Sequence, residues 1–150
     1  MTILFTGGAG YIGAHTVRAL RDASREVVVL DTLERGNREA VIDAKLIVGD
    51  VSDDALVAKI CADYKIDGVV HFAAESHVDR SIEGSEDFIL TNCFGTNVIM
   101  DAARRLEMQR VVHIGTDEVY GSVEVGSSKE TDGLEPRSPY SASKAGSDLI

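Results

Sequence analysis

The chain has 150 residues, of which 44% are hydrophobic and 27% are charged, the usual balance of a single globular domain. Its formal net charge of −10 argues against nucleic acid or an anionic membrane surface as a partner. No apolar run is long enough to cross a bilayer, and the N-terminus lacks a secretory signal pattern, so we expect a cytoplasmic protein.

The first predicted element is a strand at residues 3–5, and a glycine-rich turn leads from it into an amphipathic helix at residues 12–20. Gly7 can adopt backbone angles closed to other residues, Gly10 lets a pyrophosphate approach the backbone, and Gly13 lets the helix pack closely. The free N–H groups of the helix start would face the phosphates. The turn therefore predicts a dinucleotide site, and a plain strand-to-helix turn is the alternative.

A second apolar run at residues 26–30 predicts the next strand, and Asp31 ends it. An acidic residue about 20 positions past the glycine turn can accept hydrogen bonds from the adenosine ribose. This choice favours NAD, because a 2′-phosphate would be repelled. Arg35 is close enough in sequence to leave NADP open, and a strand-end turn is the other interpretation of Asp31.

The rest of the chain continues the alternation of apolar strands and helices. Further strands are expected at residues 45–48, 68–72 and 110–114, and helices at 52–64, at 85–106 and from 138 onward. Ser52 and Ser138 are the expected helix caps, with Pro139 in a first turn. A polar loop covers residues 122–137. Cys61 and Cys93 lack the spacing of metal ligands, so we expect reduced thiols and no metal site.

This pattern predicts an α/β protein with a Rossmann-type, doubly wound parallel sheet of five or more strands and helices on both faces. Ligands of such sheets bind beyond the carboxyl ends of the strands. All five predicted strand ends carry glycine, small or acidic residues, namely Gly7 and Gly10, Asp31, Asp50, Ala73 and Ala74, and residues 116–118. The coincidence indicates a single site along this edge.

Tyr140 and Lys144 are four residues apart on one predicted helix and share a face. A nearby ammonium favours the phenolate, so we expect Lys144 to lower the pKa of Tyr140 and make it a usable base. Taken alone, such a pair is often an ordinary surface pair.

Together, the glycine turn, Asp31, Tyr140 and Lys144 resemble the extended short-chain dehydrogenase/reductase family. Within it, three stretches resemble the dTDP-glucose 4,6-dehydratases: residues 71–82 (HFAAESHVDRSI), 116–121 (TDEVYG) and 138–144 (SPYSASK). Residues 10–15 and 36–41 are more similar to the UDP-galactose 4-epimerases, and Gly115 stands where relatives usually carry serine.

This resemblance implies an NAD-dependent lyase that oxidises C4 of a nucleotide sugar, removes water across C5 and C6, and returns the hydride to C6. Tyr140 would take the proton of the 4-hydroxyl, and Thr116 would hold the 4-oxygen. Glu118 would remove the C5 proton, and Asp117 would protonate the departing C6 hydroxyl. Lys144 would also bind the nicotinamide ribose.

The same resemblance implies further contacts. Ser76 would contact the sugar. Beside the glycines and Asp31, the residues implied to line the cofactor are Tyr11, Ile12, Asp50, Val51, Ala73, Ala74, Thr91, Tyr140 and Lys144. The helix from Ser85 resembles one that pairs across the homodimer interface of the family, although residues 88–90 fit a core equally well.

Family members are considerably longer, so we expect residues 1–150 to be an NAD-binding domain that carries the catalytic motifs, with a sheet incomplete at the C-terminus. The substrate domain would have no counterpart in this chain. Three hypotheses stand: part of a dehydratase, a UDP-sugar 4-epimerase or related dehydratase, and a dinucleotide-binding module without turnover. Asp117 and Glu118 favour the first, because an epimerase needs neither an acid nor a base at C5 and C6. The choice between dTDP and UDP stays open.

Overall fold

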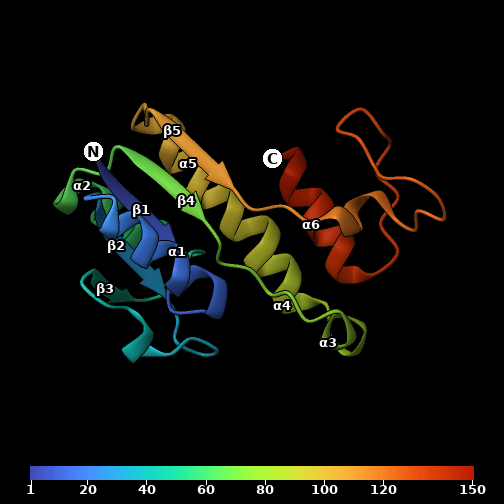
Figure 1. Cartoon of the computed structure of the whole chain (residues 1–150), viewed down its shortest axis with the longest axis horizontal. Helices are drawn as coiled ribbons and strands as arrows, with labels where there is room; N and C mark the ends of the chain where they lie inside the picture. The colour runs from blue at the N-terminus through green and yellow to red at the C-terminus, as the bar shows by residue number, and fades with distance from the viewer.

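Five strands form one fully parallel sheet in the order β3-β2-β1-β4-β5. The computed structural model describes residues 1–150, and Figure 1 shows the sheet with helices against both of its faces. The strands are β1 (Thr2–Thr6), β2 (Glu26–Asp31), β3 (Lys45–Val48), β4 (Gly68–His71) and β5 (Arg110–His113). The predicted Rossmann-type architecture is confirmed, and all five strands lie within a residue or two of their expected bounds.

The helices alternate with these strands. They are α1 (Tyr11–Asp22), α2 (Asp54–Tyr64), α3 (Val78–Glu83), α4 (Glu86–Phe88), α5 (Thr96–Arg105) and α6 (Pro139–Leu149). A π-helical segment, Ile89–Gly95, joins α4 to α5, and two short 3-10 turns cover Arg38–Ala40 and Asp117–Tyr120. None of the helices has the length and apolar composition needed to span a bilayer.

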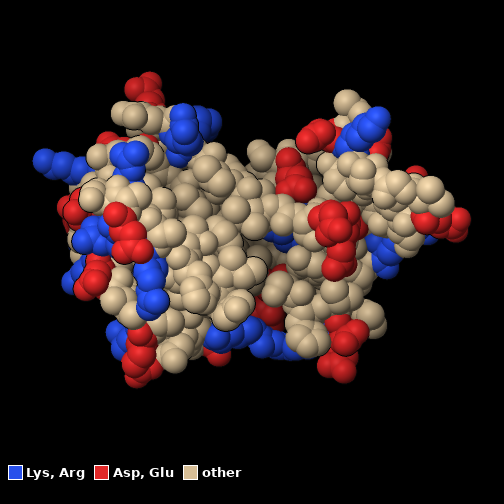
Figure 2. Space-filling model, in the orientation of Figure 1, with Lys and Arg blue, Asp and Glu red and all other residues tan.

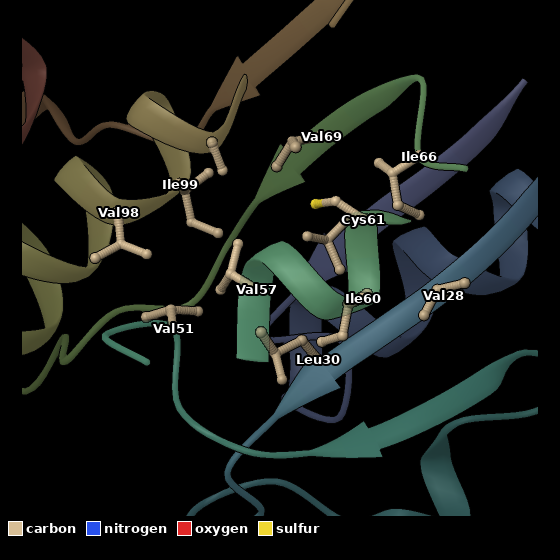
Figure 3. Packing of buried hydrophobic residues seen from close by; sticks show 12 residues of the cluster. Val28, Leu30, Val51, Val57, Ile60, Cys61, Ile66, Val69, Val98 and Ile99 are labelled. Carbon is tan, nitrogen blue, oxygen red and sulfur yellow. The ribbon is translucent and has the colours of Figure 1, made fainter. Parts of the chain in front are cut away.

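Two apolar cores cover the two faces of the sheet. On one face, side chains of α2 and α5 such as Ile60 and Ile99 pack against Leu30 of β2 and Val69 of β4, as Figure 3 shows. On the other face, Val17 of α1 packs with apolar side chains of β1 and β2. Continuous apolar strands are buried on both sides in this way because crossover helices cover each face. The strand ends are thereby held as one rigid edge.

The start of α2 differs from the expectation that Ser52 caps it. Asp53 is the cap, because its carboxylate accepts a 2.9 Å hydrogen bond from the Leu56 N–H. Ser52 lies in the turn before the helix, where its N–H donates to the Asp50 carboxylate at 2.7 Å. The Ser138 cap of α6 is confirmed, since its hydroxyl accepts from the Ser141 N–H.

The long helix expected at residues 85–106 is helical from Glu86 to Arg105, but a π-helical stretch interrupts it. Phe88 is buried, whereas Ile89 and Leu90 are about half exposed, so only Phe88 belongs to the core. Sequence reasoning did not foresee α3, whose six residues follow the segment 71–77 directly.

Candidate active site

A cleft of about 560 Å³ lies beyond the carboxyl ends of the strands. Residues that end or follow all five strands line it: Gly7, Asp31, Asp50, Ala73 and Thr116. Figure 2 shows the molecule hollowed between the part built on the sheet and the part that contains α6. The predicted convergence of the strand ends at one site is therefore what the structure shows.

The glycine turn takes its shape from steric limits. Gly7 has a φ of +73°, which favours glycine, and a Cβ there would lie 2.7 Å from the Ala73 nitrogen. A Cβ on Gly13 would overlap the Gly7 carbonyl oxygen, so the first turn of α1 packs directly on the glycine turn. Gly10 precedes α1 without any side-chain cap, which leaves N–H groups of the first turn open toward the cleft. This is a suitable cradle for a phosphate.

Asp31 is held in place at the end of β2. Its two carboxylate oxygens accept 2.9 Å hydrogen bonds from the backbone N–H groups of Ala9 and Leu33. The loop that follows folds back over the glycine turn, because the Asn37 N–H donates to the Ala9 carbonyl at 2.9 Å. The carboxylate therefore faces the cleft in a fixed position, where a ribose hydroxyl can donate to it.

Lys144 projects from α6 into the cleft and is only 4% exposed. Its ammonium donates a 2.6 Å hydrogen bond to the carbonyl of Ile114, just after β5. Burial lowers the pKa of Lys144, and the negative charge of Asp148 and the Cys93 thiol oppose that shift. The lysine is thus a buried cation attached to the sheet edge.

Tyr140 lines the same cleft, one helical turn before Lys144. Burial raises the pKa of Tyr140. Hydrogen bonding from the Thr116 side chain favours the phenolate and opposes this shift, whereas the negative charges of Glu118 and Asp117 add to it. The expectation that Lys144 lowers this pKa is wrong for the geometry observed, because burial dominates the shift and Lys144 is not among its causes. Burial therefore disfavours the phenolate of Tyr140 in this arrangement, and hydrogen bonding from Thr116 offsets part of that effect.

Beneath the site lies a buried histidine. His71 is 1% exposed, its Nδ1 lies 2.7 Å from the Thr6 hydroxyl, and its Nε2 lies 3.1 Å from the Thr96 hydroxyl. Burial, with the positive charge of His113 and of Lys144 adding to it, lowers the pKa of His71 to about 3. The imidazole is therefore neutral and serves as a hydrogen-bonded strut between β1, β4 and α5.

The predicted site residues divide into two groups. Asp117 and Glu118 are exposed and do not line the cleft, although their charges act on Tyr140. The other predicted catalytic, cofactor and substrate residues all line it, namely Gly7, Gly10, Tyr11, Ile12, Gly13, Asp31, Asp50, Val51, Ala73, Ala74, Ser76, Thr91, Thr116, Tyr140 and Lys144.

Several lining residues were not assigned to the site from the sequence. They are Leu30, Thr32, Glu34, Gly36, Gly49, Phe72, Glu75, Ile114 and Gly115, and Arg35 had been named only in connection with NADP. Nearly all of them flank a predicted strand end. A wider window around each strand end would have found them, because neighbouring backbone at a sheet edge shares one cleft.

The structure shows no cluster of histidine, cysteine and acidic side chains that would hold a metal ion. Cys61 and Cys93 are free thiols, Cys61 buried and Cys93 partly buried.

Fold and cleft together define a Rossmann-type α/β protein with its ligand site at the strand ends. A family model described as GDP-mannose 4,6 dehydratase matches residues 4–150, and the chain belongs to this family. The low-salt glycan biosynthesis protein Agl12 of Haloferax volcanii is 48% identical over the whole chain, which spans 50% of that protein.

Two solved structures are similar to this chain over nearly its whole length. DesIV, a dTDP-glucose 4,6-dehydratase of Streptomyces venezuelae solved with NAD and TYD bound, has a TM-score of 0.94 at 48% identity, over 99% of this chain and 50% of that one. The UDP-glucose 4-epimerase of Thermus thermophilus, solved with NAD, has a TM-score of 0.95 at 34% identity, over 99% of this chain and 49% of that one. The chain spans about half the length of the relatives it matches.

Proposed function

We propose that this chain forms the NAD-binding and catalytic part of a nucleotide-sugar 4,6-dehydratase with dTDP-glucose as substrate. One observation carries the proposal: Thr116, Tyr140 and Lys144 line the same cleft as the glycine turn and Asp31. The relative solved with NAD and TYD, which is named dTDP-glucose 4,6-dehydratase, supports it at 48% identity.

The residues of the cleft fit NAD. The uncapped start of α1 at Gly10 offers N–H groups and a positive dipole end to a pyrophosphate, and Asp31 offers a fixed carboxylate to the ribose. When bound, NAD would supply hydride chemistry, with oxidation at C4 of the sugar and reduction at C6. The net reaction is the loss of one water molecule.

In the proposed reaction, Tyr140 as the phenolate accepts the proton of the 4-hydroxyl, while the Thr116 hydroxyl orients the same oxygen. Burial raises the pKa of Tyr140 and makes the phenolate harder to form, so hydrogen bonding from Thr116 has to stabilise the phenolate. Lys144, held near the strand end by Ile114, would position the nicotinamide ribose. These three side chains together would carry the oxidation at C4.

The elimination would fall to the two acids. The C4 ketone acidifies the C5 proton, which Glu118 removes, and the Asp117 carboxylic acid protonates the C6 hydroxyl so that it leaves as water. Reduction at C6 completes the reaction, and Glu118 returns the proton to C5. Both acids follow Thr116 in one 3-10 turn, near enough for their charges to act on Tyr140.

A UDP-sugar 4-epimerase is the second candidate, because the Thermus thermophilus epimerase shares the fold closely. It would use Tyr140 and Lys144 but would leave Asp117 and Glu118 without a chemical role. A dinucleotide-binding module without turnover is the third. Further parts of the proposal are a cytoplasmic location and a homodimer, the latter supported by half-exposed apolar side chains on the helical segment, including Ile89 and Phe94.

The first test is a titration of residues 1–150 with NAD and with NADP by calorimetry. We expect NAD to bind more tightly, and Asp31→Ala to remove most of that preference. Equal affinities in the parent chain would contradict the cofactor assignment. We also expect the chain alone to leave dTDP-glucose unconverted, so robust formation of the 4-keto-6-deoxy product would contradict the assignment of the substrate half to another segment.

The second test separates the dehydratase from the epimerase, in a polypeptide that combines these residues with a substrate half. Asp117→Asn with Glu118→Gln should spare oxidation and slow water loss by about 10²–10⁴-fold, the usual contribution of general acid–base groups. A single-turnover experiment should show reduced nicotinamide and a 4-keto sugar that keeps its C6 hydroxyl. Formation of the 6-deoxy product at the parent rate would move the epimerase ahead.

A further inference from the structure

One ion pair joins two loops that flank the cleft. Arg35 lies in the loop after β2, and Glu75 lies in the loop after β4. The Arg35 Nε is 3.1 Å from the Glu75 Oε1, and both residues line the cleft. The pair therefore forms part of the wall of the proposed dinucleotide site.

Glu75 is the fixed member of this pair. Asn92 is 1% exposed, and its side chain accepts from the Glu75 N–H and donates to the Glu75 carbonyl, both at 2.9 Å. The same amide group donates to the Ser143 hydroxyl of α6 at 2.9 Å. The Glu75 side chain is 14% exposed, against 53% for Arg35, so the position of Glu75 determines where the guanidinium rests.

The backbone of Gly36, the residue after Arg35, passes close to the Asp31 carboxylate. A Cβ on Gly36 would lie 2.8 Å from the Asp31 Oδ1, so a side chain at this position would collide with the carboxylate. Under the proposed function, Asp31 takes the ribose 2′-hydroxyl, the group that carries a phosphate in NADP. Arginine is the residue that usually accommodates that phosphate.

Arg35 is the only arginine among the residues that line the cleft. Lys144, the other lining cation, is bonded to the Ile114 carbonyl beyond β5, at the opposite side of the sheet from β2. Arg80 of α3 lies 4.0 Å from the second oxygen of Glu75 but does not line the cleft. A 2′-phosphate near Asp31 therefore depends on Arg35 for a positive partner.

We propose that Glu75 is a specificity-determining residue: by holding the Arg35 guanidinium, it withholds that cation from a 2′-phosphate and so favours NAD over NADP. The inference rests on the proposed function, because it requires a dinucleotide bound with its adenosine ribose at Asp31. This effect is separate from the repulsion between Asp31 and a 2′-phosphate: the arginine that could bind the phosphate is present, but its charge is already paired with Glu75.

The experiment is calorimetric titration of the chain with NAD and NADP, and the readout is the ratio of the two dissociation constants. Glu75→Gln removes the charge that holds Arg35 and preserves the side-chain shape. We expect NADP to bind about tenfold more tightly, the scale of one charge-assisted hydrogen bond. The affinity for NAD should change by less than about twofold.

Glu75→Gln combined with Arg35→Ala should cancel the gain, and Arg35→Ala alone should leave the parent ratio unchanged. Glu34→Gln is the matched control for charge, since Glu34 lines the cleft without an ion pair. Three results would overturn the inference. The ratio of dissociation constants could stay unchanged in Glu75→Gln, Glu34→Gln could gain as much NADP affinity as Glu75→Gln, or the gain could persist when Arg35→Ala is added. If Glu75→Gln fails to fold by circular dichroism, weaker NADP binding in Arg35→Ala alone would overturn it. A parent chain that binds neither dinucleotide would instead refute the proposed function.

Discussion

The Lys144 ammonium donates a 2.6 Å hydrogen bond to the carbonyl of Ile114, which ties the helix that carries Tyr140 to the end of β5. A buried cation is stable only with such a partner, because burial alone disfavours its charge. The bond brings a positive charge close to His71 and His113, whose pKa values it helps to lower. The lysine therefore affects both the cleft and the histidines below it.

The first prediction concerns this charge. Lys144→Met should raise the pKa of His113, because the ammonium is one of the causes that hold it below its ordinary value. The measurement is an NMR titration of the His113 ring. Lys59→Met is the control, since Lys59 is exposed on α2 and pairs with Asp63 far from the cleft. Identical His113 titrations in the parent and Lys144→Met would refute the proximity effect.

The second prediction concerns the phenol of Tyr140. Thr116→Val should raise its pKa further, because the hydrogen bonding that favours the phenolate is lost. Asp117→Asn with Glu118→Gln should lower it, because two charges that disfavour the phenolate are removed. Phenolate absorbance against pH measures both shifts, and subtraction of Tyr140→Phe assigns the signal. Shifts of equal sign in the two variants would contradict this electrostatic account.

The third prediction concerns the glycine turn. Gly13→Ala places a methyl group onto the Gly7 carbonyl oxygen, so backbone has to move. We expect a loss of about 1–3 kcal/mol in the free energy of unfolding, the usual cost of overpacking, together with weaker NAD binding. Urea unfolding and calorimetry measure the two effects. Gly133→Ala, where a Cβ meets nothing within 4 Å, should change neither, and a similar result for both variants would disprove the steric argument.

The fourth prediction is a pH dependence of stability. The pKa of His71 falls from its ordinary value of 6.5 to about 3 in the folded protein, so the unfolded chain binds the proton more readily between these values. Stability from this group is complete above pH 6.5 and declines as the pH falls toward 3, by roughly 1.4 kcal/mol per pH unit.

His71→Gln should therefore show a shallower loss of stability between pH 6.5 and pH 5 than the parent, whatever its stability at neutral pH. Urea unfolding at both pH values gives the difference. His15→Gln, which replaces an exposed histidine on α1, should keep the parent dependence. A His71→Gln variant as acid-sensitive as the parent would mean that another group controls this range.

Much of the fold follows from local patterns in the sequence. The strand at residues 26–30 and the start of α6 at Ser138 and Pro139 were predictable, because hydrophobic period and capping act over a few residues. The first residue of α2 was not, because Asp50 accepts from the Ser52 N–H and Asp53 from the Leu56 N–H, and only the three-dimensional arrangement shows which residue caps the helix. The six-residue helix α3 was likewise missed, since so short a segment carries little periodic signal.

What the sequence by itself determined is which residues meet at the sheet edge. Parallel strands joined by right-handed crossovers bring Gly7, Asp31 and Thr116 together wherever the alternation is regular, so topology alone places them. The tertiary structure alone decided the pKa values and the ion pairs of the groups in the cleft. That Lys144 bonds the Ile114 carbonyl, that burial raises the pKa of Tyr140, and that Glu75 holds Arg35 all depend on burial and on distances between segments far apart in the chain. Both quantities exist only after the chain has packed, because the desolvation of a charge depends on everything that surrounds it.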